Sequence, residues 1–170
     1  QIFRGAHGFA GEFGHVAIDH NCEISGWEGT GTVQSLAGEQ ALAALAELPV
    51  ESQRARNDPD WVGHEIARRV QAGDPLALST LKRIGADLGI GLSTLCNLFD
   101  MEAIVLGGYL THLSEWLSGP IEAELDKRVI SRRWQPMPVL FSTMGREAAV
   151  RGAASWSLDT ILTNFDFEDN

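Results

Sequence analysis

The spacing of apolar residues along the chain predicts five helices. Apolar side chains recur every three or four residues, as on one face of a helix, and prolines or Asp-Pro pairs mark several of the ends. The predicted helices span about 32–48, 58–73, 74–99, 114–129 and 146–162. The third is apolar on more than one side, so we expect it to be largely buried. The fourth is expected to break or bend near Pro120.

Three glycines interrupt the third predicted helix. Gly85, Gly89 and Gly91 each cost roughly 1 kcal/mol of helix stability relative to alanine. We therefore predict that their small size allows close packing against a neighbouring element or a ligand.

Two short apolar runs, at 101–106 and 139–142, predict strands. Because they alternate with helices in the second half of the chain, they predict right-handed crossovers and a parallel sheet, with the first strand buried. Residues 1–19 are predicted to form a strand, a glycine-rich turn and a second strand over 15–19. Residues 20–31 hold several glycines and no periodicity, which indicates a loop.

The charge of the chain argues against direct contact with nucleic acid. Its 170 residues carry a net charge of −10 and a pI of about 4.8, and binding to duplex DNA depends on basic residues that neutralise phosphates. No apolar run approaches the ~20 residues that span a bilayer, and no signal-peptide pattern is present, so we expect a cytoplasmic protein without a membrane partner. Cys96 is predicted to be a buried thiol, and no disulfide with Cys22 is expected.

The strongest chemical candidates lie near the start of the chain. Glu12 and His15 stand three residues apart in a run rich in glycine and alanine, which lets the backbone turn sharply and a ligand approach. Glu12 accepts hydrogen bonds from hydroxyls, and His15 donates or accepts them. The vicinal hydroxyls of a sugar suit this pair. The same spacing would also suit a metal site or general-base catalysis. Alternatively, Glu12 is a solvated acid and His15 a structural histidine, and neither has a functional role.

The order R-G-A-x-G-x-A-G-E-x-G-H, from Arg4 to His15, resembles the signature of the ROK family of repressors, open reading frames and kinases. Further similar segments lie at 103–108 and 145–154, so the resemblance covers residues 1 to about 162. It implies an α/β, ribonuclease H-like fold of the actin-like ATPase and sugar kinase type. The chain would be its C-terminal lobe, a mixed sheet with parallel strands and packed helices, cut off from an N-terminal lobe. Residues 163–170 are predicted to be an acidic, frayed tail.

The resemblance also implies roles for individual residues. Glu12 and His15 would contact the hydroxyls of a bound hexose. Gln34 stands where the family has a second sugar-binding glutamate, and it keeps an acceptor oxygen while losing the charge; a surface glutamine on a helix is the alternative. Gly107 and Gly108 match glycines that let the adenosine of ATP approach the backbone, and a tight strand-to-helix turn is the alternative. The family's catalytic residues lie upstream, so none is expected in this piece.

The structural zinc of the family is predicted to be absent. In the family, three cysteines after the motif join its histidine in a tetrahedral site. Here those positions hold Ser25, Trp27 and Thr32, and the nearby His20 and Cys22 have poor spacing. We therefore expect no metal and no resident cofactor, with ATP only in a kinase. Trp27 is a candidate to hold the loop by packing, unless it is a partly exposed loop aromatic.

The missing cysteines and the change to Gln34 indicate relaxed catalytic constraint. We therefore predict the sugar-sensing effector domain of a ROK-family, NagC- and Mlc-like repressor. Its effector would be a sugar or sugar phosphate, and DNA would be reached only through an N-terminal domain outside this sequence. The alternative is the C-terminal lobe of an ATP-dependent, glucokinase-like hexose kinase, so enzymatic activity stays open. Dimerisation in the family and the five tryptophans predict a homodimer or higher oligomer.

Overall fold

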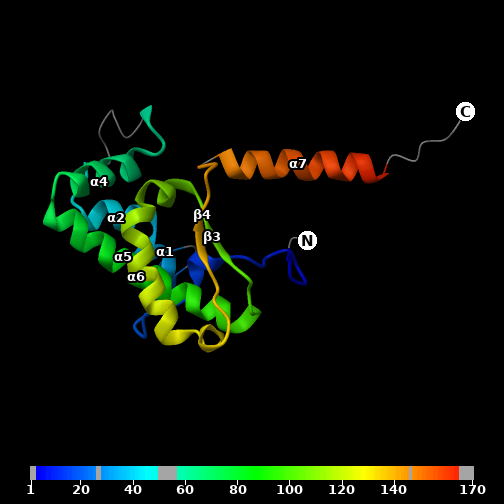
Figure 1. Cartoon of the computed structure of the whole chain (residues 1–170), viewed down its shortest axis with the longest axis horizontal. Coiled ribbons are helices and arrows are strands. Elements are labelled where there is room, and N and C mark those ends of the chain that lie inside the picture. The colour runs from blue at the N-terminus through cyan, green and yellow to red at the C-terminus, as the bar shows by residue number, and fades with distance from the viewer. Residues whose placement is uncertain (1–2, 26–27, 50–56, 146, 165–170) are drawn as a thin grey trace, which may run out of the picture.

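The computed structural model describes residues 3–25, 28–49, 57–145 and 147–164, and helices dominate it (Figure 1). The helices are α1 (Val33–Ala37), α2 (Glu39–Leu45), α4 (Trp61–Gln71), α5 (Pro75–Phe99), α6 (Ser114–Arg128) and α7 (Glu147–Asn164). Short 3₁₀ helices are η1 (Phe13–His15), η2 (Gly108–Leu113) and η3 (Ser131–Arg133). The strands are β1 (Glu23–Ser25), β2 (Glu28–Thr30), β3 (Ile104–Leu106) and β4 (Val139–Phe141).

Helix α5 is the central element of the core. Asp74 caps its first turn by accepting hydrogen bonds from the Leu76 and Ala77 amides, at 2.9 and 3.3 Å, and Asp100 ends it in the left-handed region. Its buried residues pack mainly against α6 (Figure 1). The helix therefore has nearly the predicted bounds and the predicted burial.

The glycines of α5 allow α6 and α1 to approach closely, as predicted. A Cβ at Gly85 would lie 2.7 Å from Pro120 Cβ, and one at Gly89 would lie 2.7 Å from Glu124 Cβ. A Cβ at Gly91 would lie 2.5 Å from Val33 Cγ2, on the side of α1. Helix α6 continues through Pro120, so the predicted break does not occur there.

Strands β3 and β4 pair in parallel, with Ile104 opposite Val139 and Leu106 opposite Phe141. This pairing, between helices, confirms the predicted α/β class. The expected burial of the whole first strand is wrong, because Val105 is 65% exposed while its neighbours in the strand are buried. Strands β1 and β2 form a separate antiparallel pair.

Three predictions for the first 48 residues need correction. The strand expected over 15–19 is reduced to one antiparallel bridge between Ala17 and Thr32, because η1 occupies its start. The loop expected over 20–31 contains the β1–β2 hairpin. The single helix expected over 32–48 is divided at Gly38 into α1 and α2, because the backbone there is extended (φ −72°, ψ 170°).

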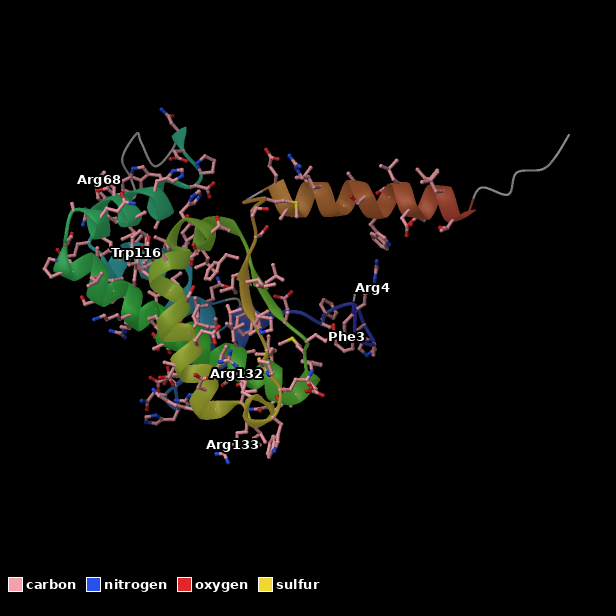
Figure 2. The ribbon with its side chains drawn as sticks, viewed as in Figure 1. Phe3, Arg4, Arg68, Trp116, Arg132 and Arg133 are labelled. Carbon is pink, nitrogen blue, oxygen red and sulfur yellow. The ribbon has the colours of Figure 1, made fainter. Side chains whose placement is uncertain are left out.

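The segment between α6 and β4 is held by Arg132 (Figure 2). Its guanidinium bonds the Glu122 carboxylate, Asp126 Oδ1 at 2.6 Å and the Met137 carbonyl at 2.9 Å. These bonds stabilise the turn that leads into β4 by joining it to α6.

Helix α7 projects from the rest of the molecule (Figure 1). Its large apolar residues are exposed: Val150, Trp156, Leu158, Ile161 and Leu162. The Arg4 guanidinium lies 4.9 Å from the centre of the Trp156 ring. Helix α7 ends at Asn164, two residues beyond the predicted helix end, and residues 165–170 of the predicted tail lie outside the described part. No described helix combines the length and the apolarity that crossing a membrane requires.

Candidate functional site

The short helix η1 fixes the position of His15. The His15 amide donates to the Glu12 carbonyl at 3.1 Å, and the chain then runs beside the residues that precede α1. The Val33 amide donates to the Val16 carbonyl at 2.9 Å, and the Ile18 amide donates to Gly31 at 2.9 Å. These bonds bring the end of the glycine-rich segment against the start of α1.

The start of α1 is fixed by a capping box. Thr32 Oγ1 accepts from the Ser35 amide at 3.2 Å, and Ser35 Oγ accepts from the Thr32 amide at 3.0 Å. Thr32 is buried and Ser35 is exposed, so the capping box gives the buried Thr32 hydroxyl a partner at the protein surface. The two hydroxyls are therefore held in place beside His15.

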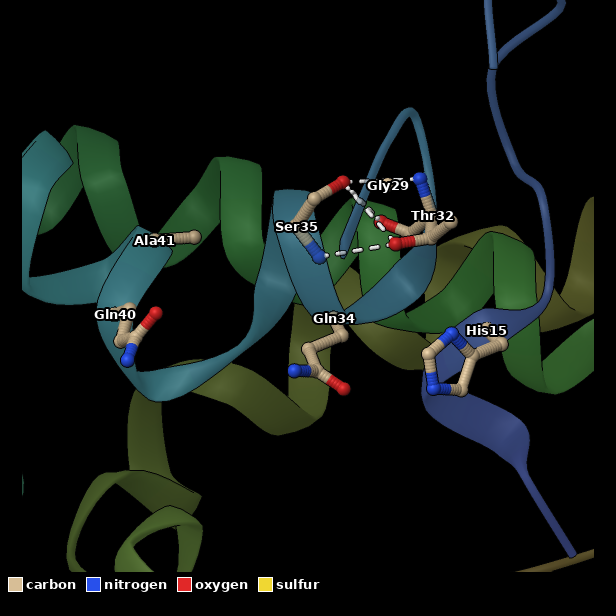
Figure 3. A pocket seen from close by; sticks show the side chains of 7 residues that line it. All are labelled: His15, Gly29, Thr32, Gln34, Ser35, Gln40 and Ala41. Atoms are coloured by element: carbon tan, nitrogen blue, oxygen red, sulfur yellow. Dashed lines mark hydrogen bonds between the residues drawn. The ribbon is translucent and has the colours of Figure 1, made fainter. Parts of the chain in front are cut away.

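A cavity of about 430 Å³ lies at this junction (Figure 3). Its lining residues are His15, Gly29, Thr32, Gln34, Ser35, Gln40 and Ala41. The structure thus brings together His15 and Gln34, two of the three residues predicted to bind a sugar. The lining offers an imidazole, two amides and two hydroxyls, which can donate hydrogen bonds to ring hydroxyls and accept them.

Glu12, the third predicted sugar-binding residue, has a different position. It is exposed, stands just before η1 and is not among the residues that line the cavity. Its carbonyl supports His15, but its carboxylate is not brought into this cavity. A sugar contact from Glu12 stays a prediction.

Gln40 is a lining residue that the sequence prediction missed. A continuous helix over 32–48 would turn it away from Gln34. The available signal was Gly38, because glycine near the middle of a helical pattern often marks its end.

The residues near His15 do not fit a tetrahedral zinc site. Among the described residues, no group of three or more His, Cys, Asp or Glu side chains is placed to hold a metal. The Thr32 hydroxyl, at a position where the family has cysteine, belongs to the capping box. The His20 side chain is 90% exposed and pairs with Asp19 at 3.4 Å. Trp27 and the Ser25 side chain lie outside the described part, so the role predicted for Trp27 stays untested.

Both cysteines are free, as predicted. Cys96 is buried, and burial raises the pKa of its thiol, whereas Cys22 is half-buried. Cys96 therefore behaves as an apolar core residue.

A second cavity, of about 550 Å³, lies beyond the carboxyl ends of β3 and β4. Its lining residues are Asp60, His112, Thr143, Met144, Gly145, Glu147 and Arg151. Ligands of α/β sheets commonly bind at this end of the strands. Gly107 and Gly108, the predicted nucleotide-binding residues, follow β3 but are not among the lining residues. Gly108 has φ +64°, so a turn alone accounts for its glycine.

Charged pairs lie in the lining of this second cavity and next to it. His64 Nδ1 lies 2.9 Å from Asp58 Oδ2, and the hydrogen bond from His64 holds the pKa of Asp58 below its usual value. The His64 and His112 rings lie 4.2 Å apart. Arg151 Nη2 lies 2.7 Å from the Glu147 carboxylate. The guanidinium group in the lining is thus already paired with an acid.

Known proteins match nearly the whole chain. Residues 1–160 match the family model described as the ROK family. A putative xylose repressor of Caldicellulosiruptor sp. (strain Rt8B.4) is 25% identical over 98% of this chain and 43% of its own length. A glucokinase of Streptomyces coelicolor is 26% identical over 91% of this chain and 52% of its own length.

The structural comparison gives the same picture. The crystal structure of a ROK family glucokinase from Streptomyces griseus, in complex with glucose and AMPPNP, is 28% identical with a TM-score of 0.73. The match covers 92% of this chain and 54% of that one. The chain therefore spans about half the length of relatives that include both repressors and glucokinases.

Proposed function

The chain belongs to the ROK family, and on this premise we propose that it is the sugar-sensing part of a transcriptional regulator. The observation that carries the proposal is the cavity that His15 and Gln34 share. It supplies hydrogen-bonding groups for a polyhydroxylated ligand. Where the family resemblance implies a second carboxylate, it presents the neutral amide of Gln34.

In this proposal the bound sugar favours one arrangement of the protein over another. The difference in sugar affinity between the two arrangements is the coupling free energy that changes DNA binding. DNA is bound by another part of the regulator, because the net charge of −10 on this chain opposes contact with phosphates. The repressors among the relatives support this proposal.

Calorimetric titration of the full chain with D-xylose and with D-glucose tests the sugar-sensing part. We expect one of the two sugars to bind. His15→Ala is expected to weaken that binding roughly tenfold or more, because the imidazole no longer donates or accepts a hydrogen bond in the cavity. Glu12→Ala is also expected to weaken binding, in line with the family resemblance. Unchanged affinity in both variants would show that the site is misassigned.

The second cavity favours a second candidate function, that of an ATP-dependent hexose kinase. Its place beyond β3 and β4 suits a nucleotide, and glucokinases are among the relatives. An ATP-coupled assay of the full-length protein over a hexose panel separates the two functions. Turnover at ordinary kinase rates, ~1–100 per second, would reject the regulator.

A further inference from the structure

Two glutamine side chains, from different helices, line the sugar cavity. Gln34 lies on α1 and Gln40 on α2, and in the view of Figure 3 Gln34 stands between His15 and Gln40. On one continuous helix, residues six positions apart point about 120° away from each other. The division between α1 and α2 is therefore what brings both amides to one cavity.

Gly38 is the residue that makes this division. It is the C-cap of α1 and the N-cap of α2 at once: its amide donates to the Gln34 carbonyl at 3.0 Å, and its own carbonyl accepts from Leu42 at 3.0 Å. A Cβ at this position would overlap the Gln34 carbonyl oxygen. A side chain at position 38 therefore requires the backbone at the junction of α1 and α2 to shift.

The polar groups of the lining are two amides, two hydroxyls and the imidazole of His15. Each amide offers one acceptor oxygen and two donor hydrogens, which suits hydroxyl groups that themselves donate and accept. The lining includes no carboxylate, ammonium or guanidinium group. A phosphate ester placed here would lose hydration without gaining the charge-assisted partners that usually hold it, and the net charge of −10 adds repulsion.

We propose that Gln40 is a second hydroxyl-binding glutamine of this site, beside Gln34, and that the site selects an uncharged sugar over its phosphate ester. This inference rests on the proposed sugar-sensing function and specifies its ligand. Gln34 and Gln40 act together on neighbouring hydroxyls, beside the imidazole of His15.

The test is calorimetric titration of the full chain with D-xylose, D-glucose and D-glucose 6-phosphate. We expect a neutral sugar to bind roughly tenfold or more tightly than the phosphate. Gln40→Ala should weaken binding of the neutral sugar by about threefold to tenfold, the effect of one or two lost hydrogen bonds. The matched control is Gln71→Ala, at an exposed glutamine near the end of α4, which should leave the affinity unchanged.

Two further variants test the geometry and the charge. Gly38→Ala should join α1 and α2, turn Gln40 away and lower the affinity as much as Gln40→Ala does, with no additional loss in the double variant. Gln40→Lys should narrow the preference for the neutral sugar, because an ammonium group attracts the phosphate.

The possible outcomes distinguish the role of Gln40 and the selectivity for a neutral sugar from the proposed sugar-sensing function. If His15→Ala weakens sugar binding and Gln40→Ala does not, the role of Gln40 is overturned while the sugar-sensing function stands. If the phosphate binds more tightly than the neutral sugars, the proposed selectivity is overturned. If the parent chain binds none of the three compounds, the sugar-sensing function fails, and this inference fails with it.

Discussion

Gly14 packs directly against the side chain of Gln34. A Cβ built on Gly14 would lie 2.9 Å from Gln34 Oε1 and 3.3 Å from Gln34 Cβ. Helix η1 thus packs against the side-chain amide of Gln34 on α1. Because Gly14 has no side chain, this amide can occupy the space next to it.

A methyl group at position 14 is therefore expected to displace the Gln34 amide. Gly14→Ala should weaken sugar binding by about threefold to tenfold, because one hydrogen-bonding group leaves its place. Its effect on thermal unfolding should be small, since the displaced atoms end a flexible, exposed side chain. Gly119→Ala, where a Cβ would have open space, is the control. An unchanged sugar affinity in Gly14→Ala would show that the amide does not contact the ligand.

Two glycines of α5 pack against different parts of the molecule: Gly91 against residues next to the sugar cavity, and Gly89 against the core helix α6. A Cβ at Gly91 would press on Val33 Cγ2 at 2.5 Å and Phe13 Cζ at 3.2 Å, behind the site, whereas Gly89 faces α6. Gly91→Ala and Gly89→Ala should each destabilise the fold by about 1–3 kcal/mol through overpacking. Only Gly91→Ala should also weaken sugar binding, measured by calorimetry at a temperature where both variants are folded. Equal affinities in the two variants would contradict this division.

Tyr109 links the turn after β3 to the end of α1. Its hydroxyl donates to the Ala37 carbonyl at 3.3 Å, and burial raises the pKa of this phenol. Tyr109→Phe should lower the free energy of unfolding by about 0.5–1.5 kcal/mol, because the carbonyl of the buried Ala37 loses its partner. Urea unfolding measures the change. An unchanged midpoint would show that water replaces the hydroxyl without cost.

Glu65 makes the stability of α4 depend on pH. The hydrogen bond from Arg68, with a further one from Arg69, lowers the pKa of Glu65 from 4.5 to about 2. Because the folded-state pKa is the lower one, this stabilisation is complete above pH 4.5 and is lost as the pH falls toward 2. We expect Glu65→Gln to remove about 1–2 kcal/mol of unfolding free energy at pH 6 and little near pH 2. Urea titrations at both pH values measure this, with Glu102→Gln, at an exposed position, as control.

Metal analysis tests the proposal that the loop after His15 folds without zinc. The purified chain should contain zinc well below one equivalent, and chelation should leave its melting temperature unchanged, because the Thr32 capping box and the Gly31 hydrogen bonds already hold this region. Stoichiometric zinc in the purified chain would contradict the proposal.

The parts of the fold that sequence could predict are those decided by long, regular patterns. The bounds of α5 followed from its capped start at Asp74 and an apolar pattern that continues over seven turns. The parallel pairing of β3 with β4 followed from the alternation of strands and helices. Such signals add up over many residues, so no single contact decides them.

The parts that failed depend on single residues and on tertiary contacts. Gly38 was compatible with a helix and with a break, and the packing of α1 against α5 through Val33 and Gly91 is a contact that no local pattern contains. The antiparallel strands β1 and β2 are likewise too short for a clear alternation. For the site, the family resemblance identified His15 and Gln34, whereas Gln40 became visible only once the helix was seen to divide.

The exposure of helix α7 makes its local stability differ from that of the core helices. Its side chains from Glu147 to Thr163 are exposed, except that of the half-buried Ala148, and a helix of this length is only marginally stable in water by local propensity. Unwinding it would bury or uncover little of the core, so it is not tied to the cooperative unit that α5 and α6 form. Its amide hydrogens should accordingly exchange with solvent long before those of α5.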